Sequence, residues 1–162
     1  VKPWQALLSG AKLPGVMSSK QEGTIPAGSI VIWDTFGELG QLYQLADAVF
    51  VGGSLAPLGG QNFLEPLALG RIPCCGLHLD NFAWALEPSG EAKQDSLEAL
   101  GLLQTGENAK AVAALLQQQL TLPTPHDAVR ERFQHWLAPA PSRHRNGAGP
   151  QRLQRYARRC AG

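Results

Sequence analysis

Two short segments of the chain place a carboxylate beside glycine, where a polar ligand could bind. In the first, residues 34–38 read Asp-Thr-Phe-Gly-Glu and join an apolar run to a helical pattern. Free backbone N–H groups at a helix start favour an anion such as a phosphate, and the carboxylate of Glu38 can accept hydrogen bonds from a sugar or a base. The segment by itself fits a plain helix cap made by Asp34 or Thr35 equally well.

The second segment is a glycine-rich loop, residues 52–62, that leads into a short helical pattern. Its two Gly-Gly pairs let the backbone adopt positive φ angles and approach a ligand closely. The loop lacks the lysine of a P-loop and does not match the dinucleotide fingerprint, so neither of those sites is indicated. Asn62 and Glu65 have the spacing of a capping box, but a glutamate one turn into a helix can instead bind two ribose hydroxyls.

A third loop, residues 76–82, follows the next apolar run and contains His78. This histidine could bind an anionic ligand or be an ordinary surface residue, and alone it decides neither. The sequence has no Asp-x-Asp pair, no cluster of His, Cys and carboxylates with metal spacing, and no Gly-x-Ser-x-Gly elbow. A metal bridging a nucleotide diphosphate and a serine nucleophile are therefore not indicated.

Alternating apolar and helical patterns predict an α/β fold that positions these three loops. Strands are expected at 29–33, 48–51 and 72–75, with a weak fourth at 102–103. The apolar run at 29–33 favours a buried parallel strand. Helices are expected at 36–46, 63–69, 81–86, 110–120, 127–137 and 151–159. Right-handed β-α-β units of this kind give a parallel sheet with helices on both faces, and ligands bind at the carboxyl ends of its strands. We expect an entry segment over 1–28 and one domain over 29–162.

Composition fits a single globular domain: of 162 residues, 44% are hydrophobic and 17% charged. No apolar run is long enough to span a bilayer, and no signal peptide opens the chain, which begins at Val1 and suggests a further N-terminal portion. Cys74 and Cys75 read as buried filler, and three cysteines make no even disulfide set, which favours a reducing compartment.

Charge is distributed unevenly. Residues 1–125 carry six Lys or Arg against eleven Asp or Glu, whereas 126–162 carry eight Arg against two acids. The basic end could contact phosphates, acidic lipid headgroups or an acidic partner, or it could be a solvated helical tail.

In this order and spacing, the three loops resemble the signature of the Kdo (3-deoxy-D-manno-octulosonic acid) transferase family. The family pattern D-T-x-G-E-L corresponds to residues 34–39, and A-D-x-x-F-V-G-G-S corresponds to 46–54. The patterns G-G-H-N-x-x-E-P and G-P-H-x-x-N-F correspond to 59–66 and 76–82. Each piece alone is weak, but the combined match is specific and spans about residues 29–159.

The resemblance implies a fold, a ligand and a set of site residues. The fold would be the C-terminal Rossmann-like domain of a GT-B glycosyltransferase, a parallel sheet sandwiched by helices. The donor would be CMP-Kdo, and the acceptor a lipid A precursor or Kdo-lipid A at the cytoplasmic face of the bacterial inner membrane. By the family's motifs, the CMP moiety would be bound by Phe36, Gly37, Glu38, Asn62, Phe63, Leu64 and Glu65.

The resemblance also implies a metal-independent transfer that inverts the anomeric carbon, with a carboxylate base deprotonating the acceptor. In the family that base lies in the N-terminal domain, so no catalytic residue is expected in this chain. The chain alone is expected to bind nucleotide weakly and to transfer nothing. Expected partners are the donor, the acceptor, that N-terminal domain and the membrane surface, with no nucleic acid.

Three departures from the family pattern bear on activity: Gln61 replaces His, Leu77 replaces Pro, and Ser18-Ser19 stands where an Arg-Ser pair is usual. They leave nucleotide binding expected and leave turnover and donor identity open. The alternatives are another GT-B transferase or a sugar-nucleotide epimerase, and a non-catalytic nucleotide-binding domain, because fold alone does not fix activity.

Overall fold

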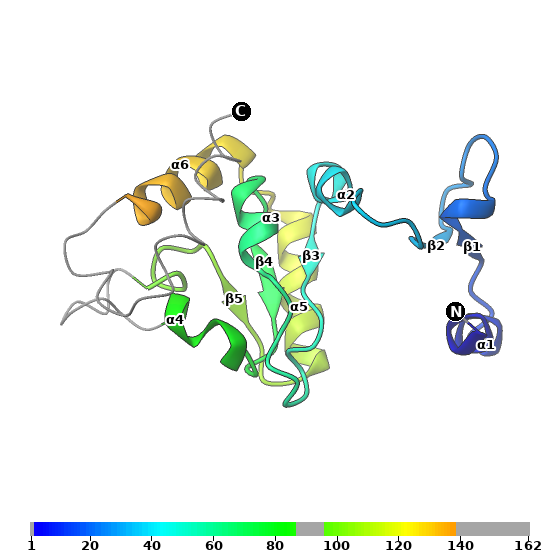
Figure 1. Ribbon diagram of the computed structural model, residues 1–162, viewed down its shortest axis with the longest axis horizontal. Coiled ribbons are helices and arrows are strands. Elements are labelled where there is room, and N and C mark those ends of the chain that lie inside the picture. Colours follow the sequence, from blue (N-terminus) through cyan, green and yellow to red (C-terminus); the bar gives the residue numbers. More distant parts are fainter. Residues whose placement is uncertain (1, 87–95, 139–162) are drawn as a thin grey trace. The chain divides into compact units, whose positions relative to one another are not determined.

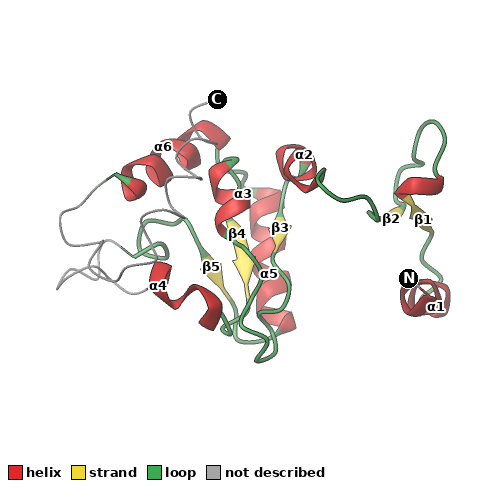
Figure 2. Cartoon of the chain, in the orientation of Figure 1, coloured by secondary structure: helices red, strands yellow, loops and turns green. Residues whose placement is uncertain are grey.

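The computed structural model describes residues 2–86 and 96–138, and the chain divides into two compact units after Leu39 (Figure 1). The first unit holds, in order, α1 (Lys2–Gly10), β1 (Gly15–Met17), the 3₁₀ helix η1 (Ser18–Lys20) and β2 (Ile30–Ile32). The second holds α2 (Leu39–Leu45), β3 (Val49–Phe50), α3 (Leu64–Ala68), β4 (Pro73–Cys75), the 3₁₀ helix η2 (Asp80–Phe82), α4 (Ala83–Leu86), β5 (Gln104–Thr105), α5 (Ala109–Thr121) and α6 (His126–Leu137). Figure 2 shows the same elements by type.

The first unit is built around a two-stranded parallel sheet. Strand β1 pairs with β2, with Gly15 opposite Ile30. A side chain at Gly15 would lie 2.5 Å from Cδ1 of Leu8, so glycine lets α1 pack closely on β1. The expected strand at 29–33 is therefore present, but its partner is a strand within the entry segment expected over 1–28. A three-residue strand such as β1 is too short to show a clear period-2 pattern.

The expectation that this strand is buried is wrong for the first unit. Ile30 is 37% exposed and Trp33 is 40% exposed. Both side chains remain accessible because α1 packs against β1, the neighbouring strand. An apolar run predicts a strand correctly here, but it does not predict how well that strand is covered.

The second unit contains a three-stranded parallel sheet in the order β3-β4-β5. Val49 lies opposite Pro73, and Cys74 lies opposite Gln104. Helix α3 connects β3 to β4, and α4 lies between β4 and β5 along the chain. These crossovers are the β-α-β units that the sequence predicts.

Helices cover both faces of this sheet. Successive side chains of a strand point to opposite faces, so each face has side chains for a helix to pack against. On one face α5 packs against β3 and β4 (Figure 1), where Gln119 of α5 donates to the carbonyl of Ile72 and to the side chain of Gln104. On the other face Cys75 joins a buried apolar cluster with α3 and α6. The prediction of a parallel sheet sandwiched by helices is thus confirmed.

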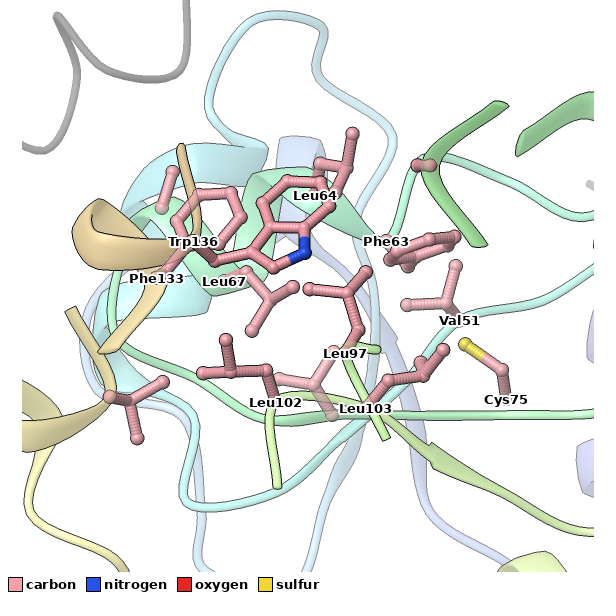
Figure 3. Close-up of a cluster of buried hydrophobic side chains, with 14 of the residues drawn as sticks. Val51, Phe63, Leu64, Leu67, Cys75, Leu97, Leu102, Leu103, Phe133 and Trp136 are labelled. Atoms are coloured by element: carbon pink, nitrogen blue, oxygen red, sulfur yellow. The ribbon is translucent and has the colours of Figure 1, made fainter. Parts of the chain in front are cut away.

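That cluster forms the core of the second unit (Figure 3). Its fully buried side chains come from α3, α6 and the segment before β5, and include Phe63, Leu64, Leu67, Leu97, Leu102 and Phe133. The rings of Phe133 and Trp136 on α6 stack with their centroids 5.7 Å apart. Burial of these large side chains fixes where α3 begins, and α3 follows directly on the glycine-rich loop.

Most predicted elements of the second unit are confirmed, with shifted ends. The pattern at 102–103 marks two buried leucines, and β5 itself begins two residues later. The helix expected from residue 36 begins only at Leu39, because Gly37 has a φ of +87° and interrupts the helical backbone. The helix expected at 151–159 lies outside the described residues.

Candidate functional site

The carboxylate of Glu38 is held by two neighbours at the end of β2. The indole Nε1 of Trp33 donates to Oε2 of Glu38 over 3.0 Å, and Oγ1 of Thr35 donates to the same oxygen over 2.7 Å. Between Thr35 and Glu38, the side chain of Phe36 is fully exposed, and Gly37 turns the chain with its positive φ. The loop therefore presents an aromatic ring and an oriented carboxylate on its surface.

Asp34 does not cap a helix but is tied to η1 earlier in the chain. Its carboxylate accepts hydrogen bonds from Oγ of Ser18 at 2.8 Å, from the backbone N–H of Ser19 at 3.0 Å and from Oγ of Ser19 at 2.6 Å. Hydrogen bonds from Ser19, and then from Ser18, lower the pKa of Asp34 from 3.8 to about 2. The two serines that replace the family's Arg-Ser pair thus anchor the start of the Glu38 loop.

The cap interpretation of this loop is wrong for Thr35 as well. Its hydroxyl donates to Glu38, three residues along the chain, and α2 starts only after that glutamate. Sequence reasoning placed the helix start too early because it could not see the bend at Gly37. The anion site expected at a helix start over residues 34–38 consequently becomes a loop of side-chain acceptors.

In the second unit, the glycine-rich loop closes on itself. The backbone N–H of Gly60 donates to the carbonyl of Gly53 at 2.9 Å, and that of Gln61 donates to Gly52 at 3.0 Å. Gly59 and Gly60 both have positive φ angles, and a side chain at Gly60 would lie 2.6 Å from Cδ2 of Leu79. The second Gly-Gly pair is therefore required for a close approach within the protein.

The third loop, residues 76–82, fastens the glycine-rich loop from the side. Asn81 donates its backbone N–H to the carbonyl of Gly59 and its side-chain amide to the carbonyl of Gly60. His78 is half-buried, and its backbone N–H donates to the carbonyl of Ser54 at 3.0 Å. The structure thus brings together the second and third loops, at the carboxyl ends of β3 and β4.

Ser54 is the buried centre of this junction, and the sequence did not single it out. Its hydroxyl donates to the carbonyl of Val51 at 2.6 Å and accepts from the backbone N–H of Gly76 at 2.8 Å. A side chain at Gly76 would lie 2.1 Å from the carbonyl oxygen of Ser54. The only available signal was the serine that closes the Gly-Gly-Ser motif after the strand.

The segment from Asn62 to Glu65 leads from this loop into α3. The side-chain oxygen of Asn62 accepts from the backbone N–H of Leu64 at 3.3 Å, which orders the turn. The side chains of Phe63 and Leu64 are fully buried in the core, so only their backbone can face a ligand. Glu65 lies close enough to Tyr43 that its charge adds to burial in raising the pKa of the phenol.

Arg71 is a further buried residue that the sequence reasoning missed. Its guanidinium donates to the backbone carbonyls of Tyr43 and Gln44, the latter through a short contact. These carbonyls lie in the last turn of α2, so the cation satisfies groups that a helix end leaves without partners. Arg71 therefore anchors the end of α2 and has a structural role.

The adjacent cysteines are core residues, as expected. Burial raises the pKa of Cys74 to about 11 and that of Cys75 to about 12. Both thiols are therefore protonated at neutral pH and are poor nucleophiles. Within residues 2–86 and 96–138, no group of three or more His, Cys, Asp or Glu side chains could hold a metal ion.

The predicted site residues fall in both units. Phe36, Gly37 and Glu38 lie in the first unit, and Asn62, Phe63, Leu64 and Glu65 lie in the second. Each group follows the carboxyl end of a parallel strand, β2 or β3, as the sequence predicts.

Fold and loops together define an α/β domain of the type found as the C-terminal half of GT-B glycosyltransferases. The crystal structure of the C-terminal CMP-Kdo binding domain of WaaA from Acinetobacter baumannii is similar in fold, with a TM-score of 0.68 and 23% sequence identity. The similarity covers 83% of this chain and 66% of that one. The predicted fold class is therefore confirmed.

The predicted resemblance to the Kdo transferase family is confirmed as well. The chain is 34% identical over 113 residues to a 3-deoxy-D-manno-octulosonic acid transferase of Bordetella pertussis and 33% identical over 117 residues to one of Haemophilus influenzae. These matches cover 70% of this chain but only 24% and 26% of the two relatives, about a quarter of their length. No protein-family model matches the chain.

The search for membrane-spanning segments gave a negative result for the described part of the chain. None of its helices is both long and apolar enough to cross a bilayer.

Proposed function

We propose that this chain is the donor-binding domain of a Kdo transferase and binds the CMP moiety of CMP-Kdo. The observation that carries the proposal is the similarity to Kdo transferases over 113 and 117 residues. It is supported by the three motif-bearing loops, which follow strands of the fold. A solved structure similar to this chain is a CMP-Kdo binding domain, which supports the same ligand for this chain. In open α/β sheets, the loops at the carboxyl ends of strands are where nucleotides bind.

The proposed contacts follow from what each residue can offer. Exposed Phe36 offers an aromatic face for the base, and Glu38 offers an oriented acceptor. The backbone of Phe63 and Leu64 and the side chain of Glu65 offer contacts for the phosphate and ribose. The fixed turn at Asn62 and the interlocked glycine loop hold that second segment in place.

The whole protein's reaction is also a proposal. Transfer of Kdo to a lipid A precursor at the cytoplasmic face of the inner membrane would require a catalytic base and an acceptor site outside this chain. The named transferases are about four times longer than the matched segment, which leaves room for such a domain. We propose that no metal is needed, because a monophosphate-linked donor has no diphosphate for a metal to bridge.

Calorimetric titration of the chain with CMP, UMP and UDP, each with and without a chelator, tests the proposed donor. CMP is expected to bind saturably, more tightly than the uridine nucleotides and unaffected by chelator. Glu65→Gln is expected to weaken CMP about tenfold, since it replaces a charged acceptor of ribose hydroxyls. Glu107→Gln, an exposed change after β5, serves as the matched control. Absence of CMP binding, or equal binding of all three nucleotides, would contradict the proposal.

A further inference from the structure

The two hydrogen bonds that hold Glu38 both end on one of its oxygens. Trp33 and Thr35 donate to Oε2, and Oε1 accepts no hydrogen bond from any described residue. A carboxylate has about four acceptor positions, so this arrangement fixes the side chain and leaves one oxygen unused. The unused oxygen lies in an exposed loop that also carries the exposed ring of Phe36.

An ionised carboxylate oxygen can only accept hydrogen bonds, and this limits what it can recognise. Of the two pyrimidine bases, cytosine carries an amino group at C4, a donor, where uracil carries a carbonyl, an acceptor. A glutamate oxygen facing that position accepts from the cytosine amine and repels the uracil carbonyl. The free oxygen of Glu38 is therefore suited to discriminate between the two bases.

We infer that Glu38 reads the C4 amino group of the donor's cytosine through Oε1, and that Trp33 and Thr35 act as positioning residues by holding Oε2. This assignment rests on the proposed function, since it names the contact that selects cytidine over uridine. Trp33 and Thr35 need not touch the nucleotide. Their effect is to hold the side chain of Glu38 so that Oε1 stays an acceptor in a fixed direction.

The structure allows a sharp test with Glu38→Gln. In this variant the indole N–H and the Thr35 hydroxyl still require an acceptor at the Oε2 position, so the amide oxygen must remain there. The amide NH₂ then takes the place of Oε1 and presents a donor. A donor at that position favours the uracil carbonyl and opposes the cytosine amine. The preference for CMP over UMP should therefore reverse.

The experiment measures the dissociation constants of CMP and UMP by calorimetry on the full chain and its variants. Wild type is expected to prefer CMP by about tenfold, and Glu38→Gln to prefer UMP, because a good base-edge contact is worth on the order of tenfold or more. Thr35→Val and Trp33→Phe should reduce the ratio of the two constants towards one. Thr35→Ser, which keeps the hydroxyl, should restore the ratio.

A second Thr-Glu pair in the same chain supplies matched controls. Oγ1 of Thr105 donates to Oε1 of Glu98 over 2.7 Å, so Thr105→Val and Glu98→Gln make the same chemical changes in the second unit. Both should leave the CMP to UMP ratio unchanged. Circular dichroism on every variant confirms that the fold is retained.

The outcomes separate the inference from the function on which it rests. CMP binding with a ratio that Glu38→Gln leaves unchanged, or lowers equally for both nucleotides, overturns the inference while the proposed function stands. A wild-type chain that binds neither nucleotide overturns both.

Discussion

Hydrogen bonds from residues far apart in sequence set the electrostatics of the Glu38 loop. Ser18 and Ser19 reach Asp34 across 16 and 15 positions, and Trp33 reaches Glu38 across five. Local sequence patterns do not encode such contacts. The motif at residues 34–39 could therefore be found from the sequence, but the hydrogen bonds that hold its side chains could not. The sequence alone left Asp34 and Thr35 open as helix caps, and only the geometry assigned them other partners.

Removing Ser19 tests the anchoring of Asp34. Ser19→Ala deletes the hydroxyl that contributes most to the lowered pKa, so the pKa of Asp34 should rise from about 2 towards 3.8. The check is a carboxylate NMR titration, with Ser96→Ala as the control because that hydroxyl accepts from the backbone N–H of Ala99 instead. An unchanged Asp34 pKa in Ser19→Ala would show that the hydrogen bond is not formed in solution.

The same lowered pKa has a defined consequence for stability. Because folding depresses this pKa, the stabilising contribution is complete above an ordinary carboxyl pKa and is lost as pH falls through about 2. Ser19→Ala should therefore lose less stability than wild type between pH 4 and about 2, as measured by urea unfolding at each pH.

At the scale of the elements, two loops of the second unit depend on close backbone approach. Ser54 bridges the ends of β3 and β4, and Asn81 holds the glycine turn. The sequence predicted that the two Gly-Gly pairs allow the backbone to approach a ligand, and it made no such prediction for Gly76. The structure shows that Gly60 and Gly76 are needed first for approach to Leu79 and Ser54. This part of the site could not be foreseen, because a Gly-Gly pair does not reveal what comes close to it.

Gly76→Ala tests that packing. The added methyl would lie 2.1 Å from the carbonyl oxygen of Ser54, so the backbone must move, and we expect a loss of about 1–3 kcal/mol in the free energy of unfolding. Gly52→Ala is the matched control, since no atom lies within 4 Å of its added methyl and its φ is not positive. It should change stability by less than about 0.5 kcal/mol. Equal losses of unfolding free energy for the two variants in urea would contradict the close packing of Gly76 on Ser54.

At the scale of the whole molecule, the sequence predicted the architecture well and its first strand poorly. The apolar runs that contain β3 and β4 and the amphipathic patterns of α5 and α6 carry strong local signals. The short strand β1 and the accessible surface of β2 do not, because both depend on what packs beside them. The candidate site residues were predicted from motifs, and the residues that hold them in position were identified only from the geometry.

The central claim is that this chain binds the cytidine nucleotide of the donor. Its most direct test follows backbone amide NMR signals as CMP is added to the isotope-labelled chain. The signals of Gly37, Glu38, Leu64 and Glu65 are expected to shift saturably, while those of Arg71 and Val129 stay in place. Shifts that do not saturate, or none at all at these residues, would contradict the account.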